Sequence, residues 1–172
     1  MFTRYLFSCY SIFRLEYRKE TTVNLNGNNM LKGISPFVSP DLLHTLHRMG
    51  HGDEIVLADA HFPGDSLNDN ILRSDGVKIQ DLLTGILPLL EIDDYVDDPI
   101  VMMDAVSGDT LDPTVEEAYL IPITKYASGA PAIKRIDRFT FYERAKNAFV
   151  IVVTGELSKY GNIILKKGVT PV

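Results

Sequence analysis

Residues 39–59 read SPDLLHTLHRMGHGDEIVLAD, and in this stretch a helical pattern leads directly into a strand pattern. Ser39 and Pro40 are typical of an N-cap and a first helical position, and the apolar residues after them recur at helical spacing. Gly50 is a natural helix stop. The apolar run over residues 54–58 predicts a buried strand that ends at the carboxylate of Asp59.

The same alternation of helical and strand patterns continues to the end of the chain. Residues 79–90 carry apolar side chains at helical spacing, which predicts an amphipathic helix whose last turn is weakened by Pro88. Further helices are expected over residues 114–119 and 138–147, and further strands over residues 100–106, 148–154 and 162–165. Continuous apolar strands between helices predict an α/β fold in which helices cover a sheet.

The composition limits the class of protein. A length of 172 residues fits one domain, and 45% hydrophobic with 23% charged residues excludes a disordered chain. The formal net charge of −6 argues against a nucleic-acid binder, and no apolar run approaches the roughly 20 residues of a membrane span. The single cysteine, Cys9, excludes a disulfide framework and a multi-cysteine zinc site. It fits a reducing compartment, so we expect a cytoplasmic protein.

The first 29 residues differ from the rest of the chain. They hold six aromatic, four basic and two acidic residues, and they close with the polar run NLNGNN at residues 24–29, which is typical of a linker. We interpret residues 1–29 as a leader or disordered tail in front of a single domain over residues 30–172. A targeting peptide and a peripheral membrane anchor are the alternatives.

Two side chains that flank the first predicted strand could carry chemistry. His51 lies between Gly50 and Gly52, where it has little local cover, and an imidazole can give and take protons near neutral pH. Asp59 stands at the carboxyl end of the strand, where open α/β sheets bind ligands. The alternatives are an exposed loop histidine without a role and an aspartate that caps the next turn.

Polar residues that suit a sugar recur later in the chain. Arg138 and Tyr142 share one face of a predicted helix and offer fixed N–H donors and a hydroxyl. A solvated helix face with Tyr142 packed in the core is the alternative. Tyr160, Gly161 and Asn162 lie between two apolar strands, where a plain hairpin turn would also use glycine and asparagine.

Cofactor and metal chemistry have little support in the sequence. It contains no glycine-rich dinucleotide loop, no phosphate-binding loop and no nucleophile elbow. His44, His47 and His51 have the spacing of metal ligands, but Gly50 ends the predicted helix before the third histidine, and no nearby residue completes the set. We therefore expect neither a cofactor nor a metal.

Several motifs occur in an order that is characteristic of one family. They are LKGISP at residues 31–36, MGHGDEI at 49–55, DAHFP at 59–63, RFTFYERA at 138–145, and TGE at 154–156 followed by YGN at 160–162. With these motifs the chain resembles the ribose pyranase and fucose mutarotase family from about Met30 to Pro171. The sequence His61-Phe62-Pro63 and Arg138 resemble the L-fucose branch, because the ribose branch typically has other residues at these places.

The resemblance implies a fold, an activity and a site. The fold is a three-layer α/β/α sandwich, and the activity is the interconversion of the α and β anomers of a free sugar, here L-fucose, without a cofactor or metal. His51 aligns with the catalytic histidine of the family. The implied substrate-binding residues are Asp59, Arg138, Tyr160, Gly161 and Asn162. Family members assemble as rings, commonly as homodecamers, with the site at a subunit boundary.

The implied activity fits general acid–base chemistry. Opening a pyranose ring needs a proton delivered to the ring oxygen and a proton removed from the anomeric hydroxyl. We predict that His51 is the proton donor, and that Asp59 both orients His51 and binds a hydroxyl. A D-ribose pyranase, a non-catalytic sugar-binding protein and a metal enzyme that uses the three histidines are the alternatives.

Overall fold

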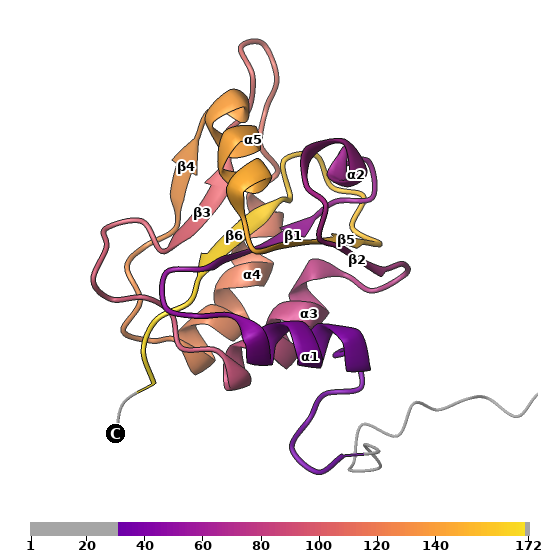
Figure 1. Ribbon diagram of the computed structural model, residues 1–172. Helices are drawn as coiled ribbons and strands as arrows, with labels where there is room; N and C mark the ends of the chain where they lie inside the picture. The colour runs from indigo at the N-terminus through magenta and orange to yellow at the C-terminus, as the bar shows by residue number, and fades with distance from the viewer. Residues whose placement is uncertain (1–30, 171–172) are drawn as a thin grey trace, which may run out of the picture.

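A computed structural model describes residues 31–170, so the segment interpreted as a leader, residues 1–29, lies outside the described residues. The centre of the domain is a six-stranded sheet with helices on both faces (Figure 1). This arrangement confirms the expected three-layer α/β/α architecture. None of the helices within residues 31–170 is both long and apolar enough to cross a bilayer.

The two ends of the strands form chemically distinct sides of the sheet, because five of its six strands run in the same direction. Its order is β2-β5-β1-β6-β3-β4, and β6 runs antiparallel to its neighbours β1 and β3. The strands are β1 Glu54–Ala58, β2 Ile71–Ser74, β3 Ile100–Met103, β4 Lys134–Ile136, β5 Val150–Thr154 and β6 Ile163–Lys166. The carboxyl ends of the parallel strands meet at one edge, which we call the carboxyl edge, where β6 begins. Their amino ends meet at the opposite edge, which we call the amino edge.

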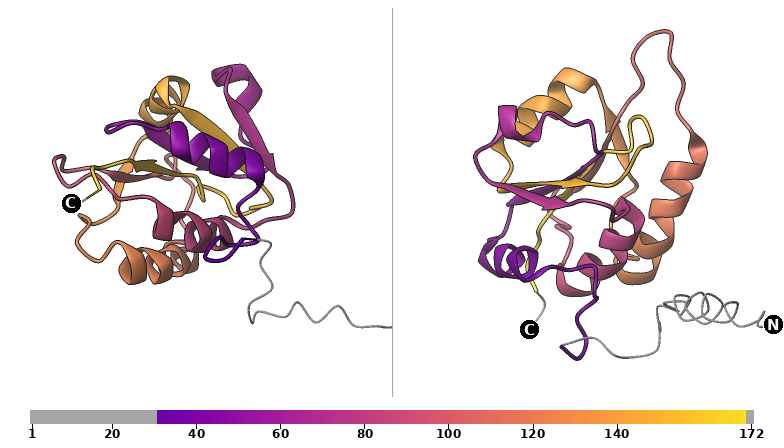
Figure 2. Two further views of the ribbon diagram at one scale, coloured as in Figure 1. Left: turned by 60° about the horizontal axis from the view of Figure 1, so that its bottom comes forward. Right: turned by 90° about the vertical axis from the view of Figure 1, so that its right-hand side faces the viewer.

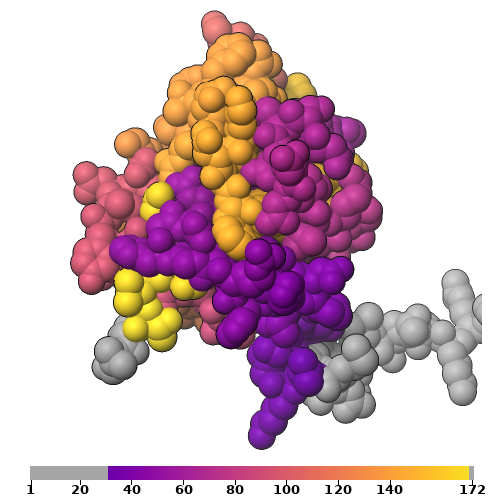
Figure 3. All heavy atoms as spheres, viewed as in Figure 1, coloured from indigo at the N-terminus to yellow at the C-terminus, as the bar shows by residue number. Residues whose placement is uncertain are grey.

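The helices divide between the two faces of the sheet (Figures 1 and 2). One face carries α1 Pro40–Arg48, α3 Ile79–Ile86, the 3-10 turn η1 Leu87–Leu89 and α4 Pro113–Tyr126. The other face carries α2 Gly64–Leu67 and α5 Arg138–Asn147. Figure 3 shows α5 beside the segment around α2, and together they cover much of the sheet on this side.

Strand β5 shows how the sheet divides the core. Val150 and Val152 pack against the layer of α1, α3 and α4, whereas Ile151 and Val153 pack against α5. All five side chains of β5 are buried. A strand that is buried on both faces has a continuous apolar sequence rather than an alternating one, which is the pattern that predicted it.

Most of the predicted elements are confirmed. The side chain of Ser39 caps α1 by accepting a hydrogen bond of 3.2 Å from Leu42 N–H. Helix α5 has the predicted bounds and is capped by Asp137, whose carboxylate accepts hydrogen bonds from two N–H groups of the first turn. Pro88 weakens the helix that contains it, because α3 ends at Ile86 and gives way to a 3-10 turn.

Other parts of the fold differ from the predictions. The helix expected over residues 114–119 continues to Tyr126, because Pro122 is accommodated inside α4. Strand β3 ends at Met103, before the predicted boundary at residue 106. Strands β2 and β4 were not predicted, because both are edge strands with half-buried and exposed side chains and therefore lack an apolar run.

Candidate functional site

The carboxyl edge of the sheet gathers most of the predicted site residues. Asp59 follows the last residue of β1, and Arg138 opens α5 directly after β4. The segment Tyr160–Asn162 leads into β6, which begins at this edge because it is antiparallel. Parallel strands that end together thus bring to one edge residues that are far apart in the sequence.

A buried asparagine clamps the carboxylate of Asp59. Asn162 is 2% exposed, and its Nδ2 donates a hydrogen bond of 2.7 Å to Oδ2 of Asp59. Its Oδ1 accepts a hydrogen bond of 2.8 Å from Asp59 N–H. The other carboxylate oxygen of Asp59 accepts a hydrogen bond of 2.8 Å from His61 N–H. Both oxygens are therefore held in place, and the half-buried carboxylate keeps lone pairs that can accept further hydrogen bonds.

The end of β1 is joined to the segment after β5. Thr154 Oγ1 donates a hydrogen bond of 2.8 Å to Ala58 O, and Ala60 N–H donates one of 2.8 Å to Glu156 O. Glu156 is itself buried, and its carboxylate accepts hydrogen bonds from Ser158 N–H and from the ammonium of Lys78. Burial alone raises the pKa of Glu156, but the hydrogen bonds from Ser158 and the nearby Lys78 lower this pKa overall.

Tyr160 has a strained backbone and a fixed hydroxyl. Its φ is 57°, in the left-handed region that residues with a side chain rarely adopt. Its hydroxyl donates a hydrogen bond of 3.0 Å to Asp109, which also accepts one of 3.1 Å from Lys159. The pKa of Asp109 lies below its ordinary value, because its carboxylate accepts a hydrogen bond from Thr110 N–H and further hydrogen bonds from Lys159 and Tyr160. Such strain at a non-glycine residue is frequent at functional sites.

Gly161 is held by a residue of α4, which packs on the face of the sheet opposite to α5. Its carbonyl accepts a hydrogen bond of 2.9 Å from the hydroxyl of Tyr119 in α4. Burial, followed by the negative charges of Glu156 and Asp59, raises the pKa of Tyr119 well above its ordinary range, so this hydroxyl remains a donor. A Cβ on Gly161 would lie 3.1 Å from Ser158 O, so the position has little room for a side chain.

Arg138 and Tyr142 share one helix but differ in their surroundings. The exposed guanidinium of Arg138 lies 4.9 Å from the ring centroid of the neighbouring Phe139. Tyr142 is half-buried and packs edge-on against Phe62, with ring centroids 5.6 Å apart. Arg138 therefore presents its N–H donors at the carboxyl edge, while Tyr142 contributes to the packing beneath α5.

His51 lies at the amino edge, away from the other predicted residues. It stands in the turn between α1 and β1, and its Nε2 is 3.4 Å from Oδ1 of Asp93. Its side chain is 49% exposed, and its ring centroid lies 5.6 Å from that of Tyr95. Asp93 follows η1 and is 2% exposed.

The expectation that Asp59 orients His51 within one chain is wrong. Five residues of β1 separate the turn of His51 from Asp59, which corresponds to roughly 16 Å at about 3.3 Å per strand residue. The oxygens of Asp59 face Asn162 and His61 N–H instead. Sequence proximity misled here because an extended strand carries its two ends to opposite edges of the sheet.

Comparison with known proteins assigns the chain to a family. The pattern of the RbsD / FucU transport protein family matches residues 32–170. The chain belongs to this family. A curated relative from Histophilus somni (strain 2336), named L-fucose mutarotase, is 59% identical over 143 residues, which are 83% of this chain and 99% of the relative.

Solved structures of the RbsD / FucU family support the same assignment. The fucose mutarotase of Streptococcus pneumoniae, solved in complex with L-fucose, is 47% identical with a TM-score of 0.72 over 82% of this chain and 100% of that chain. RbsD from Bacillus subtilis, solved with D-ribose, is 22% identical with a TM-score of 0.59 over 78% of this chain and 95% of that chain, which shows a common fold.

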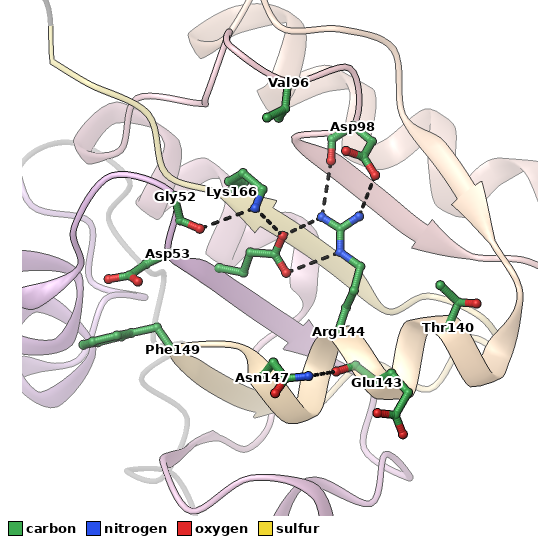
Figure 4. A pocket seen from close by; sticks show the side chains of 11 residues that line it. Gly52, Asp53, Val96, Asp98, Thr140, Glu143, Arg144, Asn147, Phe149 and Lys166 are labelled. Atoms are coloured by element: carbon green, nitrogen blue, oxygen red, sulfur yellow. Dashed lines mark hydrogen bonds and ion pairs between the residues drawn. The ribbon is translucent and has the colours of Figure 1, made fainter.

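A cleft of about 740 Å³, shown in Figure 4, is lined by residues that include neither Asp59 nor Asn162. Arg144 crosses it and binds Glu54 and Asp98, with Nη1 2.8 Å from Oδ2 of Asp98. Lys166 Nζ lies 2.9 Å from Glu54. Burial opposes the charge of Arg144, but Glu54 and Asp98 outweigh this effect and raise its pKa. Both cations, Arg144 and Lys166, are paired with carboxylates of the same chain. We therefore interpret the charged residues of this cleft as contacts that stabilise the fold rather than as a ligand-binding site.

The three histidines with metal-ligand spacing do not form a cluster. His44 and His47 line an apolar cleft beside α1, whereas His51 faces Asp93 beyond the end of the helix. Within residues 31–170 no group of three or more His, Cys, Asp or Glu side chains has a geometry that could hold a metal ion.

Some residues that contact the predicted ones carry no local signal in the sequence. Asp93 stands in the acidic run 91–98, which has the composition of a solvated loop, so no local signal indicates that its carboxylate is buried. Asp109 lies in the polar connection between β3 and α4, and its contact with Tyr160 spans 51 residues. Glu156 belongs to the motif TGE at residues 154–156, but its burial depends on tertiary packing.

Proposed function

We propose that this protein is an L-fucose mutarotase, an enzyme that interconverts the α and β anomers of the free sugar without a cofactor. The observation that carries the proposal is the clamp between Asp59 and Asn162 at the carboxyl edge, in a chain 59% identical to a protein named L-fucose mutarotase. A carboxylate fixed by a buried amide at a strand end is well suited to bind hydroxyl groups.

In this proposal the carboxyl edge binds the sugar. Asp59 accepts hydrogen bonds from hydroxyls with the lone pairs that Asn162 and the His61 N–H leave free. Arg138 extends its N–H donors from the exposed start of α5. Tyr160 and the backbone of Gly161 complete the set, with the Tyr160 hydroxyl held by Asp109.

His51 supplies the proton for ring opening. As the C1–O5 bond breaks, its electron pair goes to the ring oxygen, which takes a proton from the imidazolium. The anomeric hydroxyl loses its proton to a base, and C1 becomes an aldehyde carbon. Rotation about C1–C2 and reversal of both proton transfers give the other anomer. A well-placed acid or base of this kind accelerates a reaction by about 10²–10⁴-fold.

The positions of His51 and Asp59 require two copies of the chain in this mechanism. Because the two residues lie at opposite edges of one sheet, a single chain does not supply both to one sugar. We propose that the amino edge of one chain faces the carboxyl edge of the next. Such a head-to-tail contact is heterologous and can close into a ring, as in the expected homodecamer. A cytoplasmic location, which fits the single cysteine, is part of the same proposal.

Saturation-transfer NMR between the anomer signals tests the activity. The wild-type protein should accelerate exchange of L-fucose more than that of D-ribose, and His51→Asn should return exchange to the rate in buffer. His47→Asn, another exposed histidine nearby, is the matched control and should retain activity. Faster exchange of D-ribose would favour a ribose pyranase, and saturable binding without exchange would favour a sugar-binding protein. Loss of activity in chelator would favour the metal enzyme.

Complementation tests the shared site. His51→Asn and Asp59→Asn chains should each be inactive alone, but assemblies that contain both should regain activity. In a head-to-tail ring with random mixing, about one quarter of the sites combine an intact His51 with an intact Asp59 from the neighbour. Mixed assemblies that remain inactive would refute the two-chain site.

A further inference from the structure

A buried tyrosine connects α4 to the segment Tyr160–Asn162 at the carboxyl edge. Tyr119 is 1% exposed and belongs to the apolar core formed with α1 and α3. Its hydroxyl donates a hydrogen bond of 2.9 Å to Gly161 O. Gly161 is buried as well, so water does not compete for this carbonyl, and the hydrogen bond is stronger than one at the surface.

The carbonyl that Tyr119 binds lies between two residues that shape the site. Tyr160 precedes it and has a φ of 57°, a conformation that persists in a residue with a side chain only when the surroundings enforce it. Asn162 follows it and exchanges two hydrogen bonds with Asp59. Because a peptide group is planar, a rotation of the Gly161 carbonyl would also rotate the N–H of Asn162 and displace its side chain.

The other hydrogen bonds of this turn lie within the turn itself. Oε1 of Glu156 accepts hydrogen bonds of 2.9 Å from Leu157 N–H and Ser158 N–H. Ser158 O accepts one of 3.2 Å from Gly161 N–H. These contacts determine the shape of the turn, whereas the hydroxyl of Tyr119 fixes its place relative to the packed core.

A second contact to the turn is less firmly placed. The hydroxyl of Tyr160 donates to Asp109, which stands in the loop between β3 and α4 and is half-buried. Residues 106–108 and 110 of this loop are exposed. Tyr119 instead lies in the middle of the 14-residue helix α4, so its hydroxyl is the more rigid of the two contacts.

We propose that Tyr119 is a positioning residue for the sugar-binding residues. Its hydroxyl fixes the direction of the Gly161 carbonyl and, through the adjoining peptide group, that of Asn162. Asn162 in turn orients the carboxylate of Asp59. Tyr119 touches no sugar, so it acts on affinity rather than on the proton transfer by His51. The effect on fucose rests on the proposed function, whereas the anchoring of Asp59 does not.

Amide hydrogen exchange tests the anchoring without sugar. Tyr119→Phe keeps the ring and removes the donor. Asp59 N–H, which is bonded to Asn162 Oδ1, should then exchange roughly tenfold faster, the factor that corresponds to one lost hydrogen bond. The N–H groups of residues 55–57 within β1 should keep their wild-type rates, because the change is local. Tyr126→Phe, on the same helix but 37% exposed, is the matched control and should leave Asp59 N–H unchanged.

Anomer exchange of L-fucose tests the positioning role. Tyr119→Phe should raise the half-saturating fucose concentration roughly 3- to 10-fold, while the exchange rate at saturation should change less than about threefold. A merely structural role would lower the Tm and leave the affinity of the folded protein unchanged. Gly85→Ala provides this comparison, because its Cβ would lie 2.9 Å from Cγ2 of Val38, in the packing between α3 and the segment before α1.

A measurement on the wild-type protein serves if Tyr119→Phe does not fold. The buried hydroxyl proton of Tyr119 should exchange slowly enough to give an NMR signal. Fucose at about ten times its half-saturating concentration should slow this exchange by about tenfold, because the sugar binds only when the contact is closed. Tyr126 N–H near the end of α4 is the reference and should slow less.

The outcomes separate the inference from the proposed function. Folded Tyr119→Phe protein with wild-type exchange at Asp59 N–H overturns the inference. Wild-type fucose affinity in a variant whose Asp59 N–H exchanges faster overturns it too, as does a Tyr119 hydroxyl proton that fucose does not slow. If the wild-type protein accelerates no anomer exchange, the proposed function fails, but faster exchange at Asp59 N–H in Tyr119→Phe would still support the anchoring.

Discussion

Replacement of Asn162 by alanine should weaken both the fold and the sugar site. The substitution removes two hydrogen bonds, one from Nδ2 to the carboxylate of Asp59 and one from Asp59 N–H to Oδ1. Asn162 is 2% exposed, so water cannot easily replace the amide. The Asp59 N–H loses its acceptor, and the carboxylate loses the contact that fixes its orientation.

The two lost hydrogen bonds determine how much the free energy of unfolding should fall. A neutral hydrogen bond contributes about 0.5–1.5 kcal/mol and one to a charged group about 1.5–3 kcal/mol, so the free energy of unfolding should fall by roughly 2–4 kcal/mol. For a domain of this size, 1 kcal/mol corresponds to about 2–4 °C in Tm, which predicts a decrease of roughly 5–15 °C. Fucose affinity should fall as well, because the carboxylate of Asp59 is no longer held.

Calorimetry and saturation-transfer NMR measure the two effects. Asn147→Ala is the matched control, because its amide also donates a hydrogen bond, of 2.7 Å to Glu143 O, but from an exposed site. It should change the free energy of unfolding by less than about 0.5 kcal/mol. An Asn162→Ala protein with wild-type Tm and wild-type fucose affinity would refute the clamp as the basis of the site.

Three further predictions concern other parts of the domain. Arg138→Ala should raise the half-saturating fucose concentration at unchanged Tm, because its exposed side chain contributes donors but little packing. Burial alone raises the pKa of Glu156, but hydrogen bonds from Ser158 lower it below 4.5 overall, so its stabilising effect is present above about pH 4.5 and is lost as the pH falls through the folded-state pKa. Glu156→Gln should therefore flatten the acid side of a plot of Tm against pH. Gly155→Ala should destabilise the fold by roughly 1–3 kcal/mol in urea denaturation, because its Cβ would lie 2.7 Å from Cα of Gly76.

Each of these predictions has a control or a contradicting result. An Arg138→Ala protein that loses exchange at saturating fucose with unchanged affinity would contradict a binding role. A Glu156→Gln protein whose Tm follows the wild-type curve down to acid pH would contradict the pKa assignment. Gly129→Ala is the control for Gly155→Ala, because a Cβ at Gly129 meets no atom within 4 Å. Equal stability of the two variants would argue against the close backbone approach.

The elements whose local signals are strong could be predicted from the sequence. Helix α5 has the expected bounds because Asp137 caps its first turn and the apolar run of β5 follows within three residues. Strands β2 and β4 could not be predicted, because edge strands bury little and their pairing depends on a neighbour that is distant in the sequence. The same limit applies to the buried carboxylates, since burial is a property of the packed chain.

The site could be predicted as a set of residue types but not as a geometry. The carboxylate of Asp59 and the amide of Asn162 are separated by 103 residues, and only the antiparallel pairing of β1 with β6 brings them together. The sequence suggests the wrong neighbour for His51, because Asp59 is near in sequence while Asp93 is near in space.

For this protein, local sequence patterns determined the alternation of helices and strands, and several motifs in order pointed to the family. Periodicity and capping act between residues a few positions apart, so the chain reveals them directly. Tertiary structure alone decided that His51 and Asp59 lie at opposite edges, that Asp59 is hydrogen-bonded to Asn162, and that His51 lies beside Asp93. The physical reason is that a strand separates its own ends, while sheet pairing joins residues that the sequence keeps far apart.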